Sequence, residues 1–325
     1  MARRSWLTVD GVLLLNKPLG LSSNDALQRV RRAYRARKAG HGGTLDPLAT
    51  GVLPIAFGVA TRFLHDLVEA EKIYTATIRL GVRSSTGDGE GELTSSPGYV
   101  SAVPGATQVE AVLNRFRGPI SQRAPMYSAL KHEGKPLYEY ARAGIKIDLP
   151  DRQVTIHELS SVSVGVDELL VRVRCSKGTY IRVLAEDIGE ALGTGGYLAG
   201  LRRDSVGRFD LGQSEQLTTI ESAALSVEEN APSGLPTLLP VDAMVRDLPE
   251  VALNDHDARR FAHGQAIEMT AVESLTGMPR PETATEPAVD TDCRWRVYGD
   301  GRFLGLARQQ QQMLNPFRVL PIGAD

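Results

Sequence analysis

The chain has 325 residues, of which 42 % are hydrophobic and 23 % are charged, ordinary values for a globular protein with a sizeable core. Its formal net charge is −2, so overall charge gives no indication of nucleic-acid binding. Two cysteines without a CxxC pair argue against a disulfide framework or a structural zinc site, and no apolar run approaches the length of a membrane span. We therefore expect a cytoplasmic protein with two domains.

The chain is predicted to begin with a short buried strand over residues 11–16. A helix is then predicted from Ser22, which can cap it, to about Arg35. No acidic residue lies between Asp25 and Asp46, so this region forms a local basic patch that can bind phosphate. A solvated helix face explains the same pattern. The basic residues are Arg29, Arg31, Arg32, Arg35, Arg37, Lys38 and His41.

Residues 39–47 (AGHGGTLDP) contain too much glycine and proline for a helix or a regular strand, so we expect a loop. Its glycines permit a tight backbone path close to a ligand. Pro47 disfavours the helical region for Asp46. A carboxylate is thus held on a rigid, exposed turn, although an isolated Asp-Pro pair is usually a plain turn.

The middle of the chain is predicted to alternate strands and helices. Residues 72–82 alternate as a strand, with Tyr74 on an otherwise apolar face, where a buried hydroxyl needs a partner. A capping box at Thr107–Glu110 predicts a helix that Gly118 ends. Residues 121–150 have weak periodicity and form a long excursion, which in a compact domain tends to be functional.

A second alternating strand over residues 169–175 leads into a helix with an apolar stripe from residue 181 to 192. If Thr179 is the N-cap, Arg182 lies in the first turn, where a cation opposes the helix dipole. An arginine in that position indicates a carboxylate or phosphate partner, although an exposed arginine remains an alternative.

Composition shifts to Ser, Glu, Asn and Pro over residues 224–240, so we place a domain boundary near residue 245. Beyond it, residues 295–298, 302–307 and 317–322 are predicted strands of a small β module. Residues 270–292 have almost no apolar side chains and are predicted to be a disordered insertion.

Several segments resemble the motifs of the TruB family of pseudouridine synthases, and they occur in the family's order. The match spans about residues 11–210, and the C-terminal module is more loosely similar to the family's PUA-like domain. The matching segments are residues 11–18 (GVLLLNKP), 41–53 (HGGTLDPLATGVL), 72–74 (KIY), 125–131 (PMYSALK), 176–182 (SKGTYIR) and 201–203 (LRR).

The resemblance implies an α+β fold, in which a mainly antiparallel mixed sheet forms a catalytic domain over residues 1–245. An RNA-binding insertion is expected at about residues 121–150, and a PUA-like RNA-binding module over residues 246–325. The implied activity is isomerisation of uridine 55 in the TΨC loop of tRNA to pseudouridine. The implied partner is tRNA alone, with no cofactor, no metal, no membrane and no obligate protein partner.

The resemblance also implies roles for single residues. Asp46 matches the catalytic aspartate, Arg182 the arginine that pairs with it, and Tyr74 the tyrosine that stacks on the target base. His41, Tyr180 and Leu201 match residues that line the uridine site. RNA contacts are expected from Arg29, Arg31, Arg32, Arg35 and Lys131.

These residue types suit the chemistry, in which the N1–C1′ bond breaks, the uracil rotates and a bond forms at C5. An ionised Asp46 can attack uracil C6, attack ribose C1′, or remove a ribose proton to give a glycal, and these routes stay open. One alternative function is noncatalytic tRNA binding or RNA folding, against which Asp46, Tyr74 and Arg182 together argue. Another alternative is a related enzyme that acts on rRNA or together with a guide RNA. Because the chain lacks a long Lys-rich tail, we expect the form that acts without a guide RNA.

Overall fold

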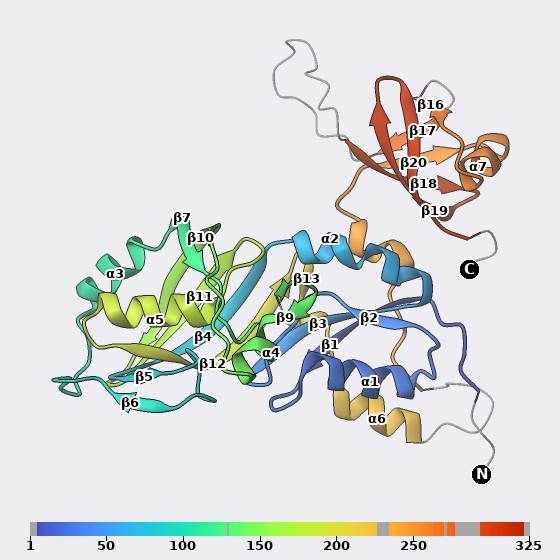
Figure 1. The fold of residues 1–325 in the computed structure, drawn as a ribbon. Helices are drawn as coiled ribbons and strands as arrows, with labels where there is room; N and C mark the ends of the chain where they lie inside the picture. The colour runs from blue at the N-terminus through green and yellow to red at the C-terminus, as the bar shows by residue number, and fades with distance from the viewer. Residues whose placement is uncertain (1–4, 129, 226–233, 270–271, 277–292, 322–325) are drawn as a thin grey trace.

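The computed structural model describes residues 5–128, 130–225, 234–269, 272–276 and 293–321 (Figure 1). A ten-stranded mixed sheet organises the larger part of the chain, and a six-stranded sheet forms a smaller C-terminal module. No helix in these ranges combines the length and the apolar character needed to cross a membrane.

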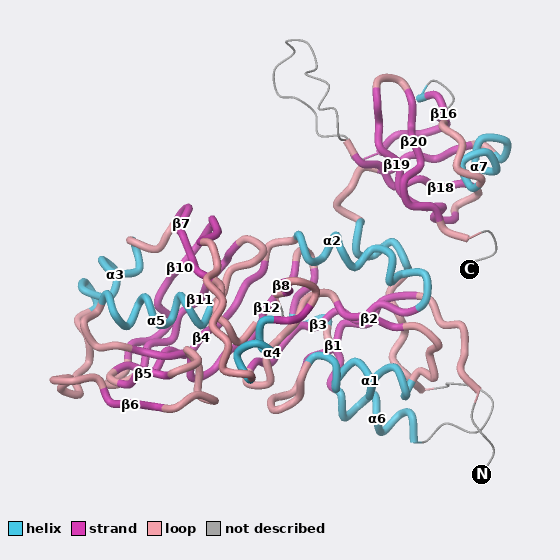
Figure 2. The backbone as a smooth tube through the Cα atoms, viewed as in Figure 1, coloured by secondary structure: helices cyan, strands magenta, loops and turns pink. Residues whose placement is uncertain are grey.

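The large sheet is mainly antiparallel, as predicted. Its order is β14-β1-β3-β12-β4-β11-β10-β7, with β2 paired to β3 and β13 paired to β12. Parallel pairing occurs between β1 and β14 and between β3 and β12. The strands run as one twisted surface across the molecule (Figure 2). Their bounds are β1 (Gly11–Lys17), β2 (Ala39–His41), β3 (Ala49–Phe57), β4 (Lys72–Leu80), β7 (Gly118–Arg123), β10 (Asp151–Val164), β11 (Glu168–Cys175), β12 (Gly196–Val206), β13 (Phe209–Asp210) and β14 (Glu215–Gln216).

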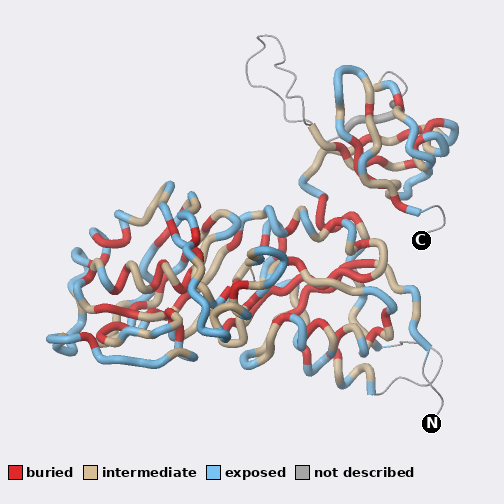
Figure 3. Tube along the Cα trace, in the orientation of Figure 1, coloured by how far each residue is buried: buried red, intermediate tan, exposed pale blue. Residues whose placement is uncertain are grey.

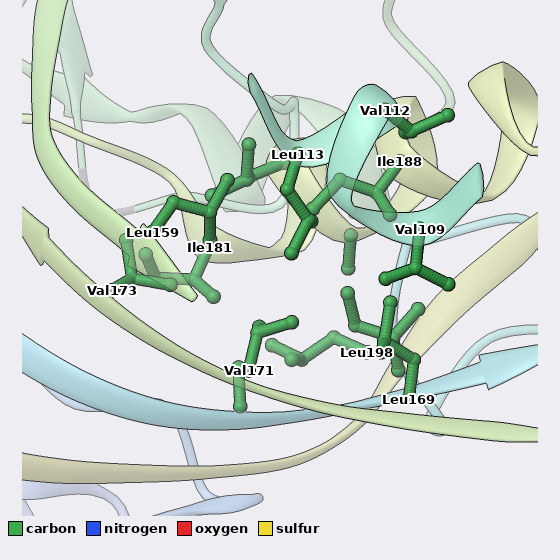
Figure 4. Packing of buried hydrophobic residues seen from close by; sticks show 14 of the residues in the cluster. Val109, Val112, Leu113, Leu159, Leu169, Val171, Val173, Ile181, Ile188 and Leu198 are labelled. Atoms are coloured by element: carbon green, nitrogen blue, oxygen red, sulfur yellow. The ribbon is translucent and has the colours of Figure 1, made fainter. Parts of the chain in front are cut away.

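Helices cover the two halves of this sheet separately. The helices α3 (Ala106–Asn114) and α5 (Ile181–Ala191) pack on strands β4, β10 and β11, where Leu113, Ile188 and Val173 are fully buried (Figure 4). The helices α1 (Ser23–Ala33) and α6 (Leu217–Leu225) pack on β1 and β3. The buried segments concentrate where helices meet strands (Figure 3). The apolar spacing of each helix thus explains which face it buries.

Two helix boundaries test the local predictions. Helix α1 begins as expected, with the Asp25 N–H donating to the Ser22 hydroxyl at 3.1 Å. The capping box at Thr107 is wrong, because α3 already starts at Ala106 after Gly105, which provides no side-chain cap. Gly118 does not end that helix but opens β7 with φ +85°.

The loop predicted over residues 39–47 is partly wrong as well. Ala39–His41 forms strand β2, because its backbone pairs with Phe57, Ala56 and Ile55 of β3. Tertiary pairing supplies the hydrogen bonds that local composition did not predict. Residues 42–47 lie outside any helix or strand, as expected.

The excursion over residues 121–150 contains little regular structure. After β7 it forms a small hairpin and one short helix, packed around the buried Leu137. A second small hairpin follows β4, and four short helical segments connect the larger elements. These elements are β5 (Val82–Ser84), β6 (Leu93–Ser95), β8 (Lys131–His132), β9 (Lys135–Pro136), α4 (Leu137–Arg142), η1 (Gly58–Phe63), α2 (Leu64–Glu69), η2 (Leu211–Gln213) and η3 (Val241–Val245).

The C-terminal module is a sheet of order β16-β20-β19-β18-β15-β17 with one helix, α7. The prediction of disorder over residues 270–292 is wrong for residues 272–276, which form β17 by antiparallel pairing with β15. The remaining residues of that segment lie outside the described residues, and the domain boundary near residue 245 stays a prediction. The elements are β15 (Glu250–Leu253), α7 (Asp255–Ala262), β16 (Ile267–Glu268), β17 (Val272–Thr276), β18 (Arg294–Gly299), β19 (Arg302–Gln310) and β20 (Met313–Val319).

The module docks on the side of the large domain that carries η1, α2 and η3 (Figure 1). Phe303 of β19 packs on Phe63, with ring centroids 5.4 Å apart. Beside this contact, Asp66 is 8 % exposed and accepts from both Arg294 and Arg318. A desolvated carboxylate between two arginines therefore ties α2 to β18 and β20.

We predict that Asp66→Asn weakens this docking, because both arginines lose their shared counter-charge. The expected loss is about 1–3 kcal/mol in the free energy of unfolding, measured by urea denaturation. The matched control is Asp148→Asn, whose side chain is 92 % exposed in an ion pair with Arg123, and which should change stability by less than about 1 kcal/mol. Equal midpoints for the two variants would contradict the tether.

Candidate active site

A cavity of about 280 Å³ opens where β4, β12 and the start of α5 meet the loop before β3. The structure brings five predicted site residues together in its wall. They are Asp46, Tyr74, Tyr180, Arg182 and Leu201, joined by the buried Arg203. His41 does not line the cavity; it lies on β2, opposite Ile55.

Backbone and side-chain contacts hold the loop that carries Asp46. Ser23 of α1 bonds Leu45 twice, accepting from its N–H at 2.7 Å and donating to its carbonyl at 3.0 Å. The N–H of Ala49 donates to the Asp46 carbonyl at 3.0 Å. Gly42 packs so closely on Leu67 that an added Cβ would lie 2.9 Å from that side chain. The carboxylate is therefore held by a turn with many contacts, but the turn is not exposed as predicted, because Asp46 is only partly exposed and lines the cavity.

Arg182 is the central cation of the cavity, and its side chain is only 7 % exposed. Its Nη2 lies 3.2 Å from Asp46 Oδ2 and donates to the Tyr127 carbonyl at 2.6 Å. Its Nη1 donates to Asp88 Oδ2 at 3.2 Å and to the Thr86 carbonyl at 3.4 Å. These partners explain a cation in the first turn of α5, where the N-cap is Tyr180 and not Thr179.

The charge on Asp46 reflects opposing influences. Burial raises the pKa of its carboxyl, even though 40 % of the side chain faces the cavity, and Asp88 adds to that shift. The Arg182 guanidinium and the Lys17 ammonium lower the pKa and so favour the ionised form. Burial in turn lowers the pKa of Lys17 to about 8. The pocket thus holds a carboxylate whose ionisation depends on its cationic neighbours.

The hydroxyl of Tyr74, which lies on an otherwise apolar face of β4, has a hydrogen-bond partner. Arg203 hydrogen-bonds to the Tyr74 side chain, while its Nε donates to the Val52 carbonyl at 2.8 Å and its Nη2 to the Gly43 carbonyl at 3.2 Å. Burial raises the pKa of the Tyr74 phenol, which stays protonated at neutral pH. One buried guanidinium therefore links the stacking candidate to the Asp46 loop.

Sequence reasoning did not identify Asp88, which lies in the glycine-rich segment of residues 87–91 (GDGEG). In the structure its side chain is 5 % exposed and pairs with Arg182. Its other oxygen accepts from the Thr86 hydroxyl at 2.6 Å and from the Glu90 N–H at 3.1 Å. The sequence did offer one indication, because the glycines on either side of Asp88 permit a backbone turn that directs its side chain into the protein.

The residues predicted to contact RNA lie outside the cavity, and several have internal partners. Arg31 donates to the carbonyls of Ala36 and Arg37 at 3.0 and 2.9 Å, and Arg35 to that of Ser5. Arg29 pairs with Glu221 at 3.7 Å. Arg32 and Lys131 are exposed. Their RNA contacts stay predictions.

Family models cover nearly the whole chain. Residues 31–181 match the N-terminal domain of TruB family pseudouridylate synthases, 182–246 the tRNA pseudouridylate synthase B C-terminal domain, and 249–320 the C-terminal domain of pseudouridine synthase II TruB. The chain is 50 % identical, over its full length and that of the relative, to tRNA pseudouridine synthase B of Burkholderia mallei. The chain belongs to the TruB family.

A second relative agrees with this chain in length, and a solved structure agrees with it in fold. The enzyme of the same name from Cupriavidus metallidurans is 48 % identical over 97 % of this chain and 95 % of its own. Among solved structures, an H/ACA ribonucleoprotein bound to a substrate RNA containing 2′-deoxyuridine aligns with a TM-score of 0.70 at 22 % identity, covering 96 % of this chain and 86 % of that chain. This likeness shows that the TruB chain shares its fold.

We predict that Asp88→Asn slows pseudouridine formation, because Arg182 loses the second carboxylate that, besides Asp46 itself, fixes its position. A misplaced catalytic group can cost about 10²-fold, so we expect a fall in kcat of that order with little change in KM. The control is Glu90→Gln, an exposed carboxylate two residues along the same turn. A kcat for Asp88→Asn equal to that of the control would exclude a role for Asp88.

Proposed function

We propose that this TruB family member converts uridine 55 in the TΨC stem-loop of tRNA to pseudouridine. The observation that carries the proposal is the Asp46–Arg182 ion pair of 3.2 Å, in a cavity that Tyr74 also lines. The full-length identity to enzymes named tRNA pseudouridine synthase B supports tRNA as the substrate. Position 55 follows from the motif resemblance of residues 11–210.

We assign a part in the proposed reaction to each of the five predicted residues in the cavity wall. The target base must leave the stacked loop to reach a recessed carboxylate, and an aromatic ring stabilises the extruded base by stacking. We assign stacking to Tyr74, further contacts to Tyr180 and Leu201, and covalent or base catalysis to Asp46. Arg182 maintains the charge and orientation of Asp46. The reaction rearranges one nucleotide, so it needs no net oxidant, reductant or group donor.

The wider partners follow from the same proposal. We assign the 121–150 excursion and the exposed basic residues, including Arg32 and Lys131, to contacts with RNA phosphates, which contribute affinity without sequence information. The C-terminal module is proposed as a second RNA-binding surface. We propose that the protein acts on tRNA in the cytoplasm without an obligate protein partner.

We predict that Asp46→Asn abolishes pseudouridine formation and leaves RNA binding nearly intact. The substitution keeps the size of the side chain but removes its charge, and loss of a catalytic group of this kind costs at least about 10³-fold. Phosphate contacts elsewhere should keep the affinity within about threefold. Product mapping on an unmodified tRNA transcript, with filter binding in parallel, measures both.

The control for that experiment is Asp247→Asn, whose carboxylate is 75 % exposed beside Arg208 and should leave turnover unchanged. Turnover of Asp46→Asn within tenfold of the wild type would exclude Asp46 as the catalytic carboxylate. Retained RNA binding without turnover in the wild type itself would favour the noncatalytic RNA-folding alternative.

The basic helix yields a prediction that separates two kinds of arginine. Exposed Arg32 should contact phosphate, so Arg32→Ala should lower the log–log salt slope of tRNA binding by about 0.7–0.9. Arg31 bonds two carbonyls beyond the helix, so Arg31→Ala should mainly lower the unfolding midpoint. Affinity at several salt concentrations and thermal unfolding distinguish them. An unchanged slope for Arg32→Ala would mean that α1 is only a solvated surface.

A further inference from the structure

Arg152 lies close to the cavity but is not one of the residues that line it. It is the second residue of β10, opposite Gln122 of β7. It shares a strand face with Val154 and Ile156, which are 4 % and 0 % exposed. The guanidinium of Arg152 lies over the Tyr180 ring, 5.7 Å from the centroid. An added Cβ on Gly178 would lie 3.8 Å from its Nη1.

This guanidinium lacks a counter-charge. No hydrogen bond or ion pair joins the side chain of Arg152 to any residue that the structure describes, and its Nε is buried without an acceptor. A buried N–H of a charged group without a partner is unfavourable. The two Nη groups of Arg152 are not among these buried atoms, so an oxygen from outside the chain can reach them.

The neighbouring cations differ in having carboxylate partners, although the Nε of Arg174 is likewise buried without an acceptor. Arg123 pairs with Asp148 and Asp151, and Lys177 pairs with Glu69. Arg174 pairs with Glu71 and Glu158 at 3.0 Å each. Carboxylates therefore neutralise the cations around Arg152, and none of these carboxylates contacts Arg152 itself.

The surroundings of Arg152 are also rigid. Gln122 is 2 % exposed, and its side-chain amide makes two hydrogen bonds with the backbone of Tyr180. It accepts from the Tyr180 N–H at 3.0 Å and donates to the Tyr180 carbonyl at 3.3 Å. The cation–π contact with the Tyr180 ring, at 5.7 Å from its centroid, helps to position the planar guanidinium. Such a fork matches two oxygens of a phosphate.

We propose that Arg152, supported by Tyr180 and Gln122, forms a subsite for one backbone phosphate of the RNA strand next to the extruded uridine. The subsite rests on the proposed function, because the Ser176–Tyr180 turn beside Arg152 lines the cavity that would receive the base. A nucleotide that rotates into this cavity carries its own phosphates to the rim. Arg152 is thus a positioning residue that binds the strand and takes no part in bond breaking.

The test uses the full-length protein and an unmodified TΨC stem-loop RNA. Arg152→Met keeps length and removes charge, Arg152→Lys keeps charge and removes the fork, and Arg123→Met is the matched control from a carboxylate-paired arginine of the same sheet edge. For Arg152→Met we expect KM to rise about tenfold and the log–log salt slope to fall by about 0.7, with kcat within about threefold. Arg152→Lys should keep the slope, and Arg123→Met should keep both.

A set of stem-loops, each with one uncharged methylphosphonate in place of a phosphate, gives an independent readout. Wild type should lose affinity at one position next to the target, and Arg152→Met should show no further loss there. An unchanged slope together with a lower kcat in both Arg152 variants would overturn the proposal and make Arg152 a support for Tyr180 only. Failure of the wild type to form pseudouridine would instead refute the proposed function.

Discussion

The rest of the site depends on the contacts that the buried guanidinium of Arg182 makes. It contacts oxygens from three separate segments: Asp46 in the loop before β3, Thr86 and Asp88 in the turn after β5, and Tyr127 in the excursion after β7. Burying such a cation is unfavourable unless good geometry satisfies its donors. The packing of α5 on the sheet supplies that geometry, because Ile181 and Leu184 anchor the turn from which Arg182 projects.

The second buried arginine completes this arrangement from the opposite side. Arg203 reaches Tyr74, Gly43 and Val52 from β12. Burial lowers the pKa of both Lys17 and His41, and the charge of Arg203 adds to that shift. The carboxyl of Asp46 therefore lies between cationic neighbours, Arg182 and Lys17, and the second carboxyl of Asp88. Burial raises the pKa of Asp46, and Arg182 and Lys17 oppose that shift by favouring the ionised form.

Sequence reasoning succeeded where local chemistry pointed to a missing partner. Arg182 in the first turn of a helix indicated a carboxylate or phosphate partner, the family resemblance identified that partner as Asp46, and Asp46 is 3.2 Å away. Tyr74 on an apolar face required a hydroxyl partner, but nothing local could identify Arg203, which lies on another strand. Asp88 was missed for the same reason, since its burial depends on a contact with residue 182. Basic patterning likewise could not reveal that Arg31 bonds its own backbone neighbours.

The order of strands in the large sheet has a consequence for biosynthesis. Strand β12 joins the half that carries Asp46 to the half that carries Tyr74, pairing Leu201 with both Ala49 and Ala76. The parallel pairing of β3 with β12 closes a loop of roughly 150 residues, and contacts so distant in the chain form slowly. A nascent chain on the ribosome therefore cannot join these two halves of the candidate site until β12 has emerged.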